Sequence, residues 1–398
     1  MQACLFLTLV SMPFRQYSVV SKGVLLLPLL AVGAVVLAGW GRLMNRRLPV
    51  LVVLFALWTG GSLMWSADRR GSVVALSAFA AVVVLALCSA WLLTLDQVAR
   101  TVLWSVQALI AVTVLSLVLA PEWSTAPPAL DPVSGWHGPF SHKNGLGAFL
   151  VLAVVTLGSL PGRRRGLWLA ATAVLLVGAR SSTALAISAI VVLVLLWAKG
   201  LVRQHLPAGR LAYVTVSALV TGVAVSAVTL APGLIANALG RNLTLTGRTE
   251  IWGAVEHQIA LRPVNGFGWG GVWRATSPPT LQMWREARFN AYYAHNGYLD
   301  VLLQVGAVGL VLLLAIIAVT AVRLTNAPAT PVTLWSLLVL GSLCISAFSE
   351  SAPFTDALGL LLITVLGVST CQRRSPTRQA GRRPHVPATA MPPSGAMT

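Results

Sequence analysis

The sequence has 398 residues, of which 57% are hydrophobic and only 10% are charged, and its formal net charge is +18. This composition excludes an ordinary soluble globular domain, in which roughly a quarter of the residues are charged. A strong positive charge can indicate a nucleic-acid partner. Here the arginines stand in short connectors between apolar runs, which is a pattern of membrane topology. We therefore predict an all-α, polytopic integral membrane protein that contacts membrane lipids and no nucleic acid.

Apolar runs long enough to cross a membrane recur along the chain. A spanning helix needs about 20 mostly apolar residues to cross the hydrocarbon core. Windows of this length predict eleven spans, and residues 1–12 could form part of a twelfth. The predicted fold is a bundle of about 11–12 transmembrane helices. In chain order the predicted spans are 22–40, 48–65, 71–93, 98–120, 145–160, 166–180, 181–201, 211–231, 298–322, 332–349 and 355–370.

The basic residues predict the orientation of these spans. Short cytoplasmic connectors carry an excess of Lys and Arg. With the spans placed as above, the basic connectors and the tail all fall on one side, which we interpret as the cytoplasm. The residues on that side are Arg42, Arg46, Arg47, Arg163, Arg164, Arg165, Lys199, Arg203, Arg210, Arg323, Arg373, Arg374, Arg378, Arg382 and Arg383.

This topology divides the chain into four parts. Residues 1–231 hold transmembrane helices with an outer loop at 121–144, and residues 298–370 hold the C-terminal transmembrane helices. Residues 371–398 are basic and Pro-rich, which predicts a disordered cytoplasmic tail. Residues 232–297 form one large extracytoplasmic loop. Because long ordered connectors usually carry function, we expect the chemistry of the protein there.

An amphipathic helix is predicted inside the large loop, over residues 246–263. Ile251, Val255 and Ile259 recur at a spacing of four residues, which places them on one face of a helix. Pro263 would end this helix. The loop is therefore predicted to be helical.

Arg248 lies at the predicted start of this helix, where Thr246 or Thr249 can act as the cap. The free N–H groups and the dipole of a helix N-terminus favour an anion. Arg248 would strengthen a phosphate site at this position. A solvated residue at the start of the helix is the alternative interpretation.

A glycine-rich run, NGFGWGG, follows at residues 265–271. Such a run could let the backbone approach a ligand closely, or it could simply form a turn. Downstream, the segment AHNGY at residues 294–298 leads into a predicted span, so His295 is expected at the membrane surface. His295 could also be an ordinary interfacial or capping residue.

These motifs together resemble the O-antigen ligase family, which also contains O-antigen and exopolysaccharide polymerases. The resemblance rests on GRTEIW, RPVNGFGWGG and AHNGYLDVLLQVGAVGLVLL in this order and spacing, and upstream on WSADRR at 65–70 and FSHKNGLGAFL at 140–150. It covers most of the chain, from about residue 50 to 370. The HKN form is most similar to the exopolysaccharide polymerase branch.

The resemblance implies a membrane glycosyltransferase in the bacterial inner membrane, with its site facing outside the cytoplasm. Such an enzyme takes a glycan from an undecaprenyl-diphosphate-linked donor and joins it to an acceptor hydroxyl of a glycan or lipid-glycan, with inversion and without a metal or other cofactor. The diphosphate is already a good leaving group, so its charge mainly needs to be held, and arginine does this bidentately. Histidine exchanges protons near neutral pH, so it can activate the acceptor.

The matching positions imply specific roles. His295 would be the base that activates the acceptor, Arg248 a catalytic ligand of the diphosphate, and Arg180 in GARSSTALA a second diphosphate ligand. The family commonly has a Ser-Arg or Ser-Lys pair at that point, whereas this chain has Ala179 and Arg180 followed by two serines. An Arg at the end of a span could instead snorkel towards the membrane surface.

Four further residues are candidates for substrate binding: His142, Lys143, Glu250 and Asn296. For His142 and Lys143 the alternative is a hydrogen-bonded or snorkelling role in the loop, and for Glu250 it is a solvated ion pair. Several aromatic residues could stack on sugars, although aromatic residues also gather at membrane interfaces by default. These are Trp269, Trp273, Trp284, Tyr292 and Tyr293.

Two alternatives to a glycosyltransferase stay open. One is a transporter or flippase of a lipid-linked saccharide, which would also be polytopic and basic, but transporters tend to show broken helices and ionisable residues near the midplane. The other is a noncatalytic assembly or sensor protein. Within the enzyme interpretation, a ligase and a polymerase share the donor and differ in the acceptor, and protein O-glycosylation is a third option. The HKN motif favours a polymerase.

Overall fold

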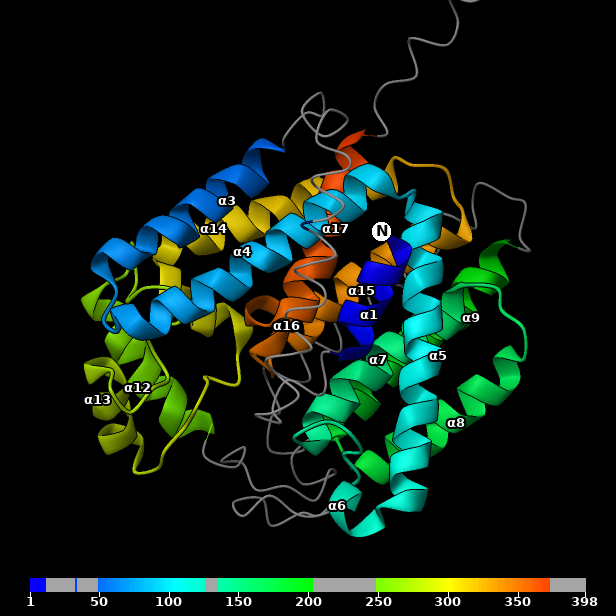
Figure 1. Ribbon diagram of the computed structural model, residues 1–398, viewed down its shortest axis with the longest axis horizontal. Helices are drawn as coiled ribbons and strands as arrows, with labels where there is room; N and C mark the ends of the chain where they lie inside the picture. Colours follow the sequence, from blue (N-terminus) through cyan, green and yellow to red (C-terminus); the bar gives the residue numbers. More distant parts are fainter. Residues whose placement is uncertain (12–32, 34–48, 126–134, 203–247, 373–398) are drawn as a thin grey trace, which may run out of the picture.

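The computed structural model describes residues 1–11, 33, 49–125, 135–202 and 248–372, and every regular element in these residues is helical. Figure 1 shows the helices gathered into one bundle, with shorter helices at one end. The predicted spans 22–40 and 211–231 lie outside the described residues, as do most of the predicted tail and the first part of the large loop. The all-helical prediction is confirmed for the described part of the chain.

The other nine predicted spans each coincide with a helix, with boundaries that differ by a few residues. By length and composition, α4, α5 and α14 can each cross a membrane alone, and the remaining apolar helices are shorter. The first helix of the chain, α1 (Gln2–Ser11), has ten residues and packs on α5. The helices of the spans are α3 (Val50–Gly61) with the 3₁₀ turn η2 (Ser62–Trp65), α4 (Arg69–Leu92), α5 (Leu95–Leu119), α7 (Lys143–Ser159), α8 (Arg165–Ala179), α9 (Ser182–Val202), α14 (Gly297–Thr325), α15 (Pro331–Ser346) and α17 (Ala357–Gln372).

Polar caps explain where several of these helices begin. Thr94 and Gln97 form a reciprocal capping box at the start of α5, which satisfies two backbone N–H groups that the helix itself leaves free. The side chains of Asp68 and His142 cap α4 and α7 in the same sense. The apolar runs of α4, α5 and α7 are thus each preceded by a residue whose side chain fixes the start of the helix.

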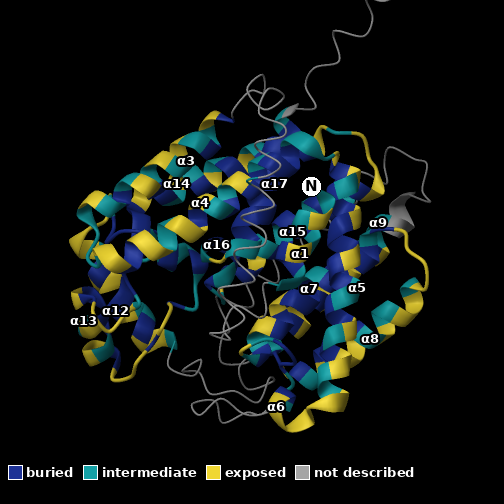
Figure 2. Cartoon of the chain, in the orientation of Figure 1, coloured by how far each residue is buried: buried dark blue, intermediate teal, exposed yellow. Residues whose placement is uncertain are grey.

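Helix packing places the core in the middle of the bundle. α17 packs along α4 and α14, and α7 packs against α8, α9 and α15. Figure 2 shows that α17 is buried along most of its length, whereas α3, α4 and α8 present many exposed residues. Several of these exposed side chains are large and apolar, such as Leu57 and Val177. Apolar side chains on an outward face are expected where lipid replaces water as the solvent.

The predicted helix at 246–263 is confirmed as α12, which the structure describes as Arg248–Leu261. Ile251 and Val255 are fully buried and Ile259 is half-buried, as their spacing predicts. The possible cap Thr249 instead lies within the helix, and Thr246 is outside the described residues. A second helix of the loop, α13 (Pro278–Ala287), packs against α12.

α14 is broken at Gly306, and the glycine-rich run fills the break. Gly306 adopts φ 67° and ψ −171°, a conformation that is open essentially only to glycine. The N–H of Phe267 donates to the Leu303 carbonyl at 2.9 Å and that of Gly268 donates to the Gln304 carbonyl at 2.8 Å. These bonds replace the ones that a continuous helix would form.

Other backbone polar groups at the break also have hydrogen-bond partners. The indole of Trp58 donates to the Val305 carbonyl at 2.8 Å, and the Ala307 N–H donates to the Pro263 carbonyl at 2.8 Å. Within the run, the Gly270 N–H donates to the Gln304 side chain at 2.8 Å. Because these N–H groups already have partners, the run is a packed turn in this structure and offers few free amides for a phosphate.

The WSADRR motif joins α4 to the large loop. Asp68 accepts from the Gly71 N–H at 3.0 Å and from the Thr276 hydroxyl at 2.9 Å. The pKa of Asp68 is lowered, chiefly because of the hydrogen bond from Gly71. Nearby, the Trp65 indole donates to the Asn265 carbonyl at 2.9 Å. The motif therefore holds the loop against the end of the bundle.

Candidate functional site

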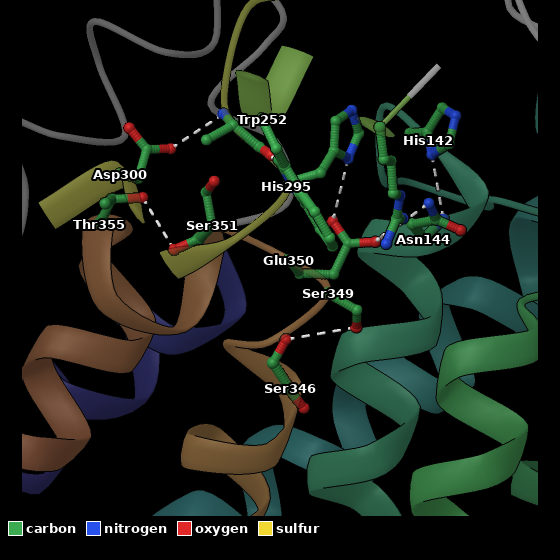
Figure 3. Close-up of polar contacts among 12 residues, drawn as sticks. His142, Asn144, Trp252, His295, Asp300, Ser346, Ser349, Glu350, Ser351 and Thr355 are labelled. Atoms are coloured by element: carbon green, nitrogen blue, oxygen red, sulfur yellow. Dashed lines mark hydrogen bonds and ion pairs between the residues drawn. The ribbon is translucent and has the colours of Figure 1, made fainter. Parts of the chain in front are cut away.

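Glu350 is the residue on which the polar side chains of the site converge. It lies in the short turn between α15 and α16 (Ala352–Thr355), at the end of the bundle that we predict to face outside the cell. One carboxylate oxygen, Oε1, is 3.4 Å from the Arg248 guanidinium and accepts from the Asn144 amide at 3.2 Å. The other, Oε2, lies 3.8 Å from Nδ1 of His295. Figure 3 shows Glu350 between His295 and Asn144.

The three charged or ionisable partners come from segments far apart in the sequence. Arg248 is the first described residue of α12, His295 precedes α14, and Glu350 follows α15. The side chains of Arg248 and Glu350 are 12% and 14% exposed, and that of His295 is 29% exposed. Reduced solvent access strengthens their mutual electrostatic interaction. The two residues predicted to be catalytic, Arg248 and His295, are thus brought together by an acid.

His295 has a constrained backbone and one unsatisfied ring nitrogen. Its φ is 51°, in the left-handed region, which few non-glycine residues occupy outside turns and functional sites. Its Nδ1 is buried and makes no hydrogen bond, although Glu350 lies 3.8 Å away. A small movement of either side chain would bring the two into hydrogen-bonding distance.

Tyr293 packs against the imidazole of His295, with ring centroids 4.3 Å apart. The phenol is 40% exposed. Burial of the remainder raises the pKa of Tyr293, with a smaller contribution from the negative charge of Glu350. Tyr293 therefore forms a neutral aromatic wall beside the imidazole at physiological pH.

The N-terminus of α7 forms the adjoining wall. His142 caps this helix, with its Nδ1 accepting from the Asn144 N–H at 3.1 Å, and Figure 3 shows its ring beside Asn144. Lys143 is buried. His142 is therefore accounted for as the cap of α7. Asn144, in the same turn, donates to Glu350. The HKN motif therefore adjoins the site through its asparagine.

Arg180 lies at the same end of the bundle but does not join the group on Glu350. It ends α8 in a left-handed conformation and is exposed. Within the described ranges it forms no ion pair with an acidic residue. A cavity beside it is lined by Trp136 and Gly178 among others. Gly135 lies between Lys143 and the end of α8. A Cβ added at Gly135 would be 3.1 Å from Lys143 Cδ and 2.6 Å from the Ala179 carbonyl oxygen, so Lys143 is close to the residue before Arg180.

Two of the predicted substrate ligands lie outside this group. Glu250 is exposed on α12 and accepts from the Thr249 hydroxyl at 2.9 Å. Asn296 caps α14, and its side-chain oxygen accepts from the N–H groups of Tyr298 and Leu299. Both residues were predicted to bind substrate. In the structure Glu250 is exposed, and the oxygen of Asn296 is engaged in the cap.

The aromatic residues of the loop divide in the same way. Trp269 is buried in the core, and Trp273 donates its indole N–H to Asp300. The indole of Trp284 donates to the carbonyl of Ala291. Tyr292 and Tyr293 remain exposed. Of the five aromatic residues proposed for sugar stacking, these two tyrosines present open ring surfaces.

An apolar cavity of about 350 Å³ lies between α1, α7, α15 and α17. Its lining includes Leu9, Phe149, Leu343 and Leu362, and it reaches Gly145, which follows Asn144 in the chain. The cavity thus begins next to the polar site and continues between the helices. For metal binding, no group of three or more His, Cys, Asp and Glu side chains meets among the residues that the structure describes.

Glu350 and Asn144 were not among the site residues predicted from the sequence. Asn144 was inside a quoted motif, but Glu350 belonged to none. A signal for Glu350 was present, since the chain has only ten acidic residues and this one directly follows the predicted span 332–349. An acid at the predicted outer end of a span, in a chain rich in Arg, was a reasonable candidate partner for Arg248.

Comparisons with known proteins show which sequences this chain is similar to. Residues 165–314 match the model of a family described as O-antigen ligase, a region that contains Arg180, Arg248 and His295. Over 202 residues the chain is 28% identical to the exopolysaccharide production protein ExoQ of Rhizobium meliloti. That match covers 45% of this chain and 45% of the relative, so it spans less than half of the relative's length. The resemblance stated from the motifs is confirmed.

Proposed function

We propose that this chain, a member of the O-antigen ligase family, is a membrane glycosyltransferase that transfers or polymerises glycan from an undecaprenyl-diphosphate-linked donor. Its acceptor would be a hydroxyl of a glycan or lipid-glycan, during the synthesis of cell-surface polysaccharide. The observation that carries this proposal is the meeting of Arg248 and His295 on Glu350. A cation for the leaving diphosphate and a base for the acceptor are the two groups that the reaction needs.

The donor diphosphate would bind between Arg248 and the positive side chains at the other wall. Arg248 can turn its free N–H groups towards a phosphate while Glu350 holds the guanidinium in place. Lys143 and Arg180 lie at the same end of the bundle and would add positive charge. These charges stabilise the diphosphate as it departs with the bonding electrons of the glycosidic bond.

His295 would remove the proton from the acceptor. Because Nδ1 faces Glu350, Nε2 is the nitrogen that remains to accept the proton. The acceptor oxygen bonds to the anomeric carbon as the bond from that carbon to the diphosphate breaks, and the configuration is inverted. Glu350 stabilises the imidazolium that forms, as a carboxylate does beside any protonated histidine.

The apolar cavity supports a lipid-linked donor. It starts beside Asn144 and is lined by the side chains of membrane-spanning helices. A polyprenyl chain with its diphosphate near Arg248 would have a nearby apolar space for its first isoprene units. The hydrophobic effect would then add to the binding of the charged group.

We place the enzyme in the bacterial inner membrane, with the site facing away from the cytoplasm. The positive connectors identified in the sequence support this orientation. The described basic residues Arg163, Arg164, Arg165 and Arg323 lie at the ends of α8 and α14 remote from Glu350. The relative's name, which refers to exopolysaccharide production, favours polymerisation over ligation to a lipid core.

A transporter or flippase is the alternative. The break in α14 at Gly306 is the type of feature that transporters use to bind ions. Here the groups freed by the break bond to Phe267, Gly268 and Trp58. The break is therefore filled by protein and leaves little room for an ion. It supports a transporter less well than the meeting of Arg248 and His295 on Glu350 supports an enzyme.

Reconstitution with a defined donor tests the proposal. Purified protein in lipid vesicles would be given a carrier-linked oligosaccharide, first alone and then with candidate acceptors. A ladder of longer carrier-linked glycans supports a polymerase, and a single new adduct supports a ligase. Donor that crosses the bilayer without any new glycosidic bond would favour the flippase and defeat the enzyme.

A further inference from the structure

Asp300 is a buried acid in the first turn of α14 that the proposed reaction does not use. Its side chain is 1% exposed, and no Lys or Arg of the described chain forms an ion pair with it. A carboxylate removed from water is costly unless hydrogen-bond donors compensate for the loss. The position therefore demands a specific set of donors, and the structure provides one.

These donors come from three segments. The indole of Trp273 donates to Oδ1 at 2.6 Å, and the Gln304 amide donates to the same oxygen at 3.2 Å. The backbone N–H of Ala294 donates to Oδ2 at 3.3 Å. Asp300 thus connects the turn after the glycine run, the helix α14 and the turn that carries His295.

The turn of His295 is held through both backbone polar groups of the preceding residue, Ala294. While the N–H of Ala294 donates to Asp300, its carbonyl accepts from the Trp252 indole at 2.9 Å. The next residue, His295, has φ 51°. A left-handed non-glycine residue persists only when its surroundings fix it, and the two bonds at Ala294 supply that constraint.

The turn of Glu350 lies against the same acid. The buried Ser351 hydroxyl, in the residue that directly follows Glu350, forms no hydrogen bond, and Figure 3 shows Ser351 near Asp300. The N–H of Gly297 also donates to the Ala347 carbonyl at 2.7 Å. The turn that carries His295 and the turn that carries Glu350 therefore both lie near Asp300.

We propose that Asp300 is a positioning residue, whose buried carboxylate fixes the His295 turn through the N–H of Ala294, while the bond from Gly297 to Ala347 holds that turn beside the Glu350 turn. Asp300 touches neither the donor nor the acceptor in this arrangement. It sets the distance and direction of the imidazole instead. This inference rests on the proposed function, because His295 is the base only if the protein is a transferase.

Asp300→Asn tests the role with little change in shape. The amide keeps one acceptor but turns the other oxygen into a donor, so Ala294 or Trp273 loses its partner. We expect kcat to fall about 10²-fold, as a misplacement near 1 Å can cause, while the KM for the donor stays within about two-fold because the cationic groups are untouched. Asp96→Asn is the matched control, since Asp96 is an exposed acid in the first turn of α5.

A second readout does not depend on turnover. The rate at which diethyl pyrocarbonate modifies His295, followed by mass spectrometry, reports the environment of the imidazole. We expect Asp300→Asn to change this rate several-fold and Asp96→Asn to leave it unchanged. A wild-type protein that makes no glycosidic bond would defeat the proposed function, and the modification rates would still decide the role of Asp300.

Trp252→Phe is a second test of the same turn, which can be used if Asp300→Asn does not fold. Phenylalanine keeps most of the ring and removes only the N–H that binds the Ala294 carbonyl. It should lower kcat and alter the modification rate in the same direction as Asp300→Asn. If Asp300→Asn matches Asp96→Asn in kcat and in modification rate, the inference is wrong. If Asp300→Asn does not fold, wild-type values for Trp252→Phe overturn it.

Discussion

Nδ1 of His295 lies 3.8 Å from Oε2 of Glu350, and the same carboxylate holds Arg248 through its other oxygen. One acid therefore links the proposed base to the proposed diphosphate ligand. Any change at Glu350 acts on both halves of the reaction, which separates it experimentally from residues that act on one half.

Glu350→Gln should lower kcat/KM by about 10- to 100-fold, since a hydrogen bond to a charged group is worth roughly 1.5–3 kcal/mol. Glutamine keeps the shape but no longer neutralises Arg248 or supports the imidazolium. The measurement is initial rate against donor concentration in reconstituted vesicles. Glu256→Gln, on the exposed face of α12, serves as the control, and equal rates for both variants would contradict the role of Glu350.

His295→Ala should reduce kcat by about 10²- to 10⁴-fold, the usual contribution of a general base. Binding of the donor should persist, because Arg248 stays in place. His257→Ala is the matched control, as His257 is exposed and pairs with Glu286. Both variants would be compared in single-turnover assays. A His295→Ala protein that transfers glycan as fast as His257→Ala would rule out the proposed base.

Arg180→Ala should raise the donor KM more than it lowers kcat, because Arg180 lies apart from Glu350 and would hold the diphosphate in both the ground state and the transition state. An increase of roughly ten-fold corresponds to about 1.4 kcal/mol. Arg285→Ala, an exposed arginine of α13, controls for the loss of general positive charge. Unchanged donor KM in Arg180→Ala would place Arg180 outside the donor site.

Asp68→Asn should destabilise the protein in a pH-dependent manner. The pKa of Asp68 is lowered on folding, so its ionised form stabilises the fold. This contribution is complete above the ordinary value of 3.8 and is lost as the pH falls through the lower folded pKa. Thermal unfolding should therefore separate wild type from Asp68→Asn at pH 7, and the gap should close under strong acid. A gap that is constant with pH would contradict this explanation.

Gly306→Ala should destabilise α14 by about 1–3 kcal/mol, because its φ of 67° strains any other residue. An added Cβ would also lie 2.1 Å from the Val264 carbonyl oxygen. Gly341→Ala is the matched control, since Gly341 is within α15 and nothing lies within 4 Å of its added Cβ. Thermal unfolding in lipid should show a lower midpoint for Gly306→Ala alone.

Much of the fold could be predicted from the sequence, because each membrane helix needs a long apolar run and such runs are easy to read. The apolar face of α12 followed from the spacing of Ile251 and Val255. The break in α14 could not be read, because the segment 298–322 is apolar on both sides of Gly306. That break depends on a distant partner, the glycine run, which the sequence suggested only as a turn or ligand loop.

The candidate site was predictable where a motif carried it. Arg248 and His295 lie in the motifs shared with the family, and the structure places both beside Glu350. Glu350 was missed because its role arises only from the folding together of α7, α12 and α15. Glu250 is exposed and the oxygen of Asn296 caps α14, so neither joins the residues around Glu350 in this structure, and their roles in substrate binding stay predictions.

The filling of α14 by Phe267 and Gly268 has a consequence for how the protein is made. The glycine run is synthesised before α14, so it can form its bonds to Leu303 and Gln304 only after α14 has been made. Cut away from α14, it would leave the carbonyls of Leu303 and Gln304 without donors, at a cost of roughly 1–3 kcal/mol each. The glycine run and α14 are therefore one assembly unit, and we expect that neither can be exchanged for a homologous part without the other.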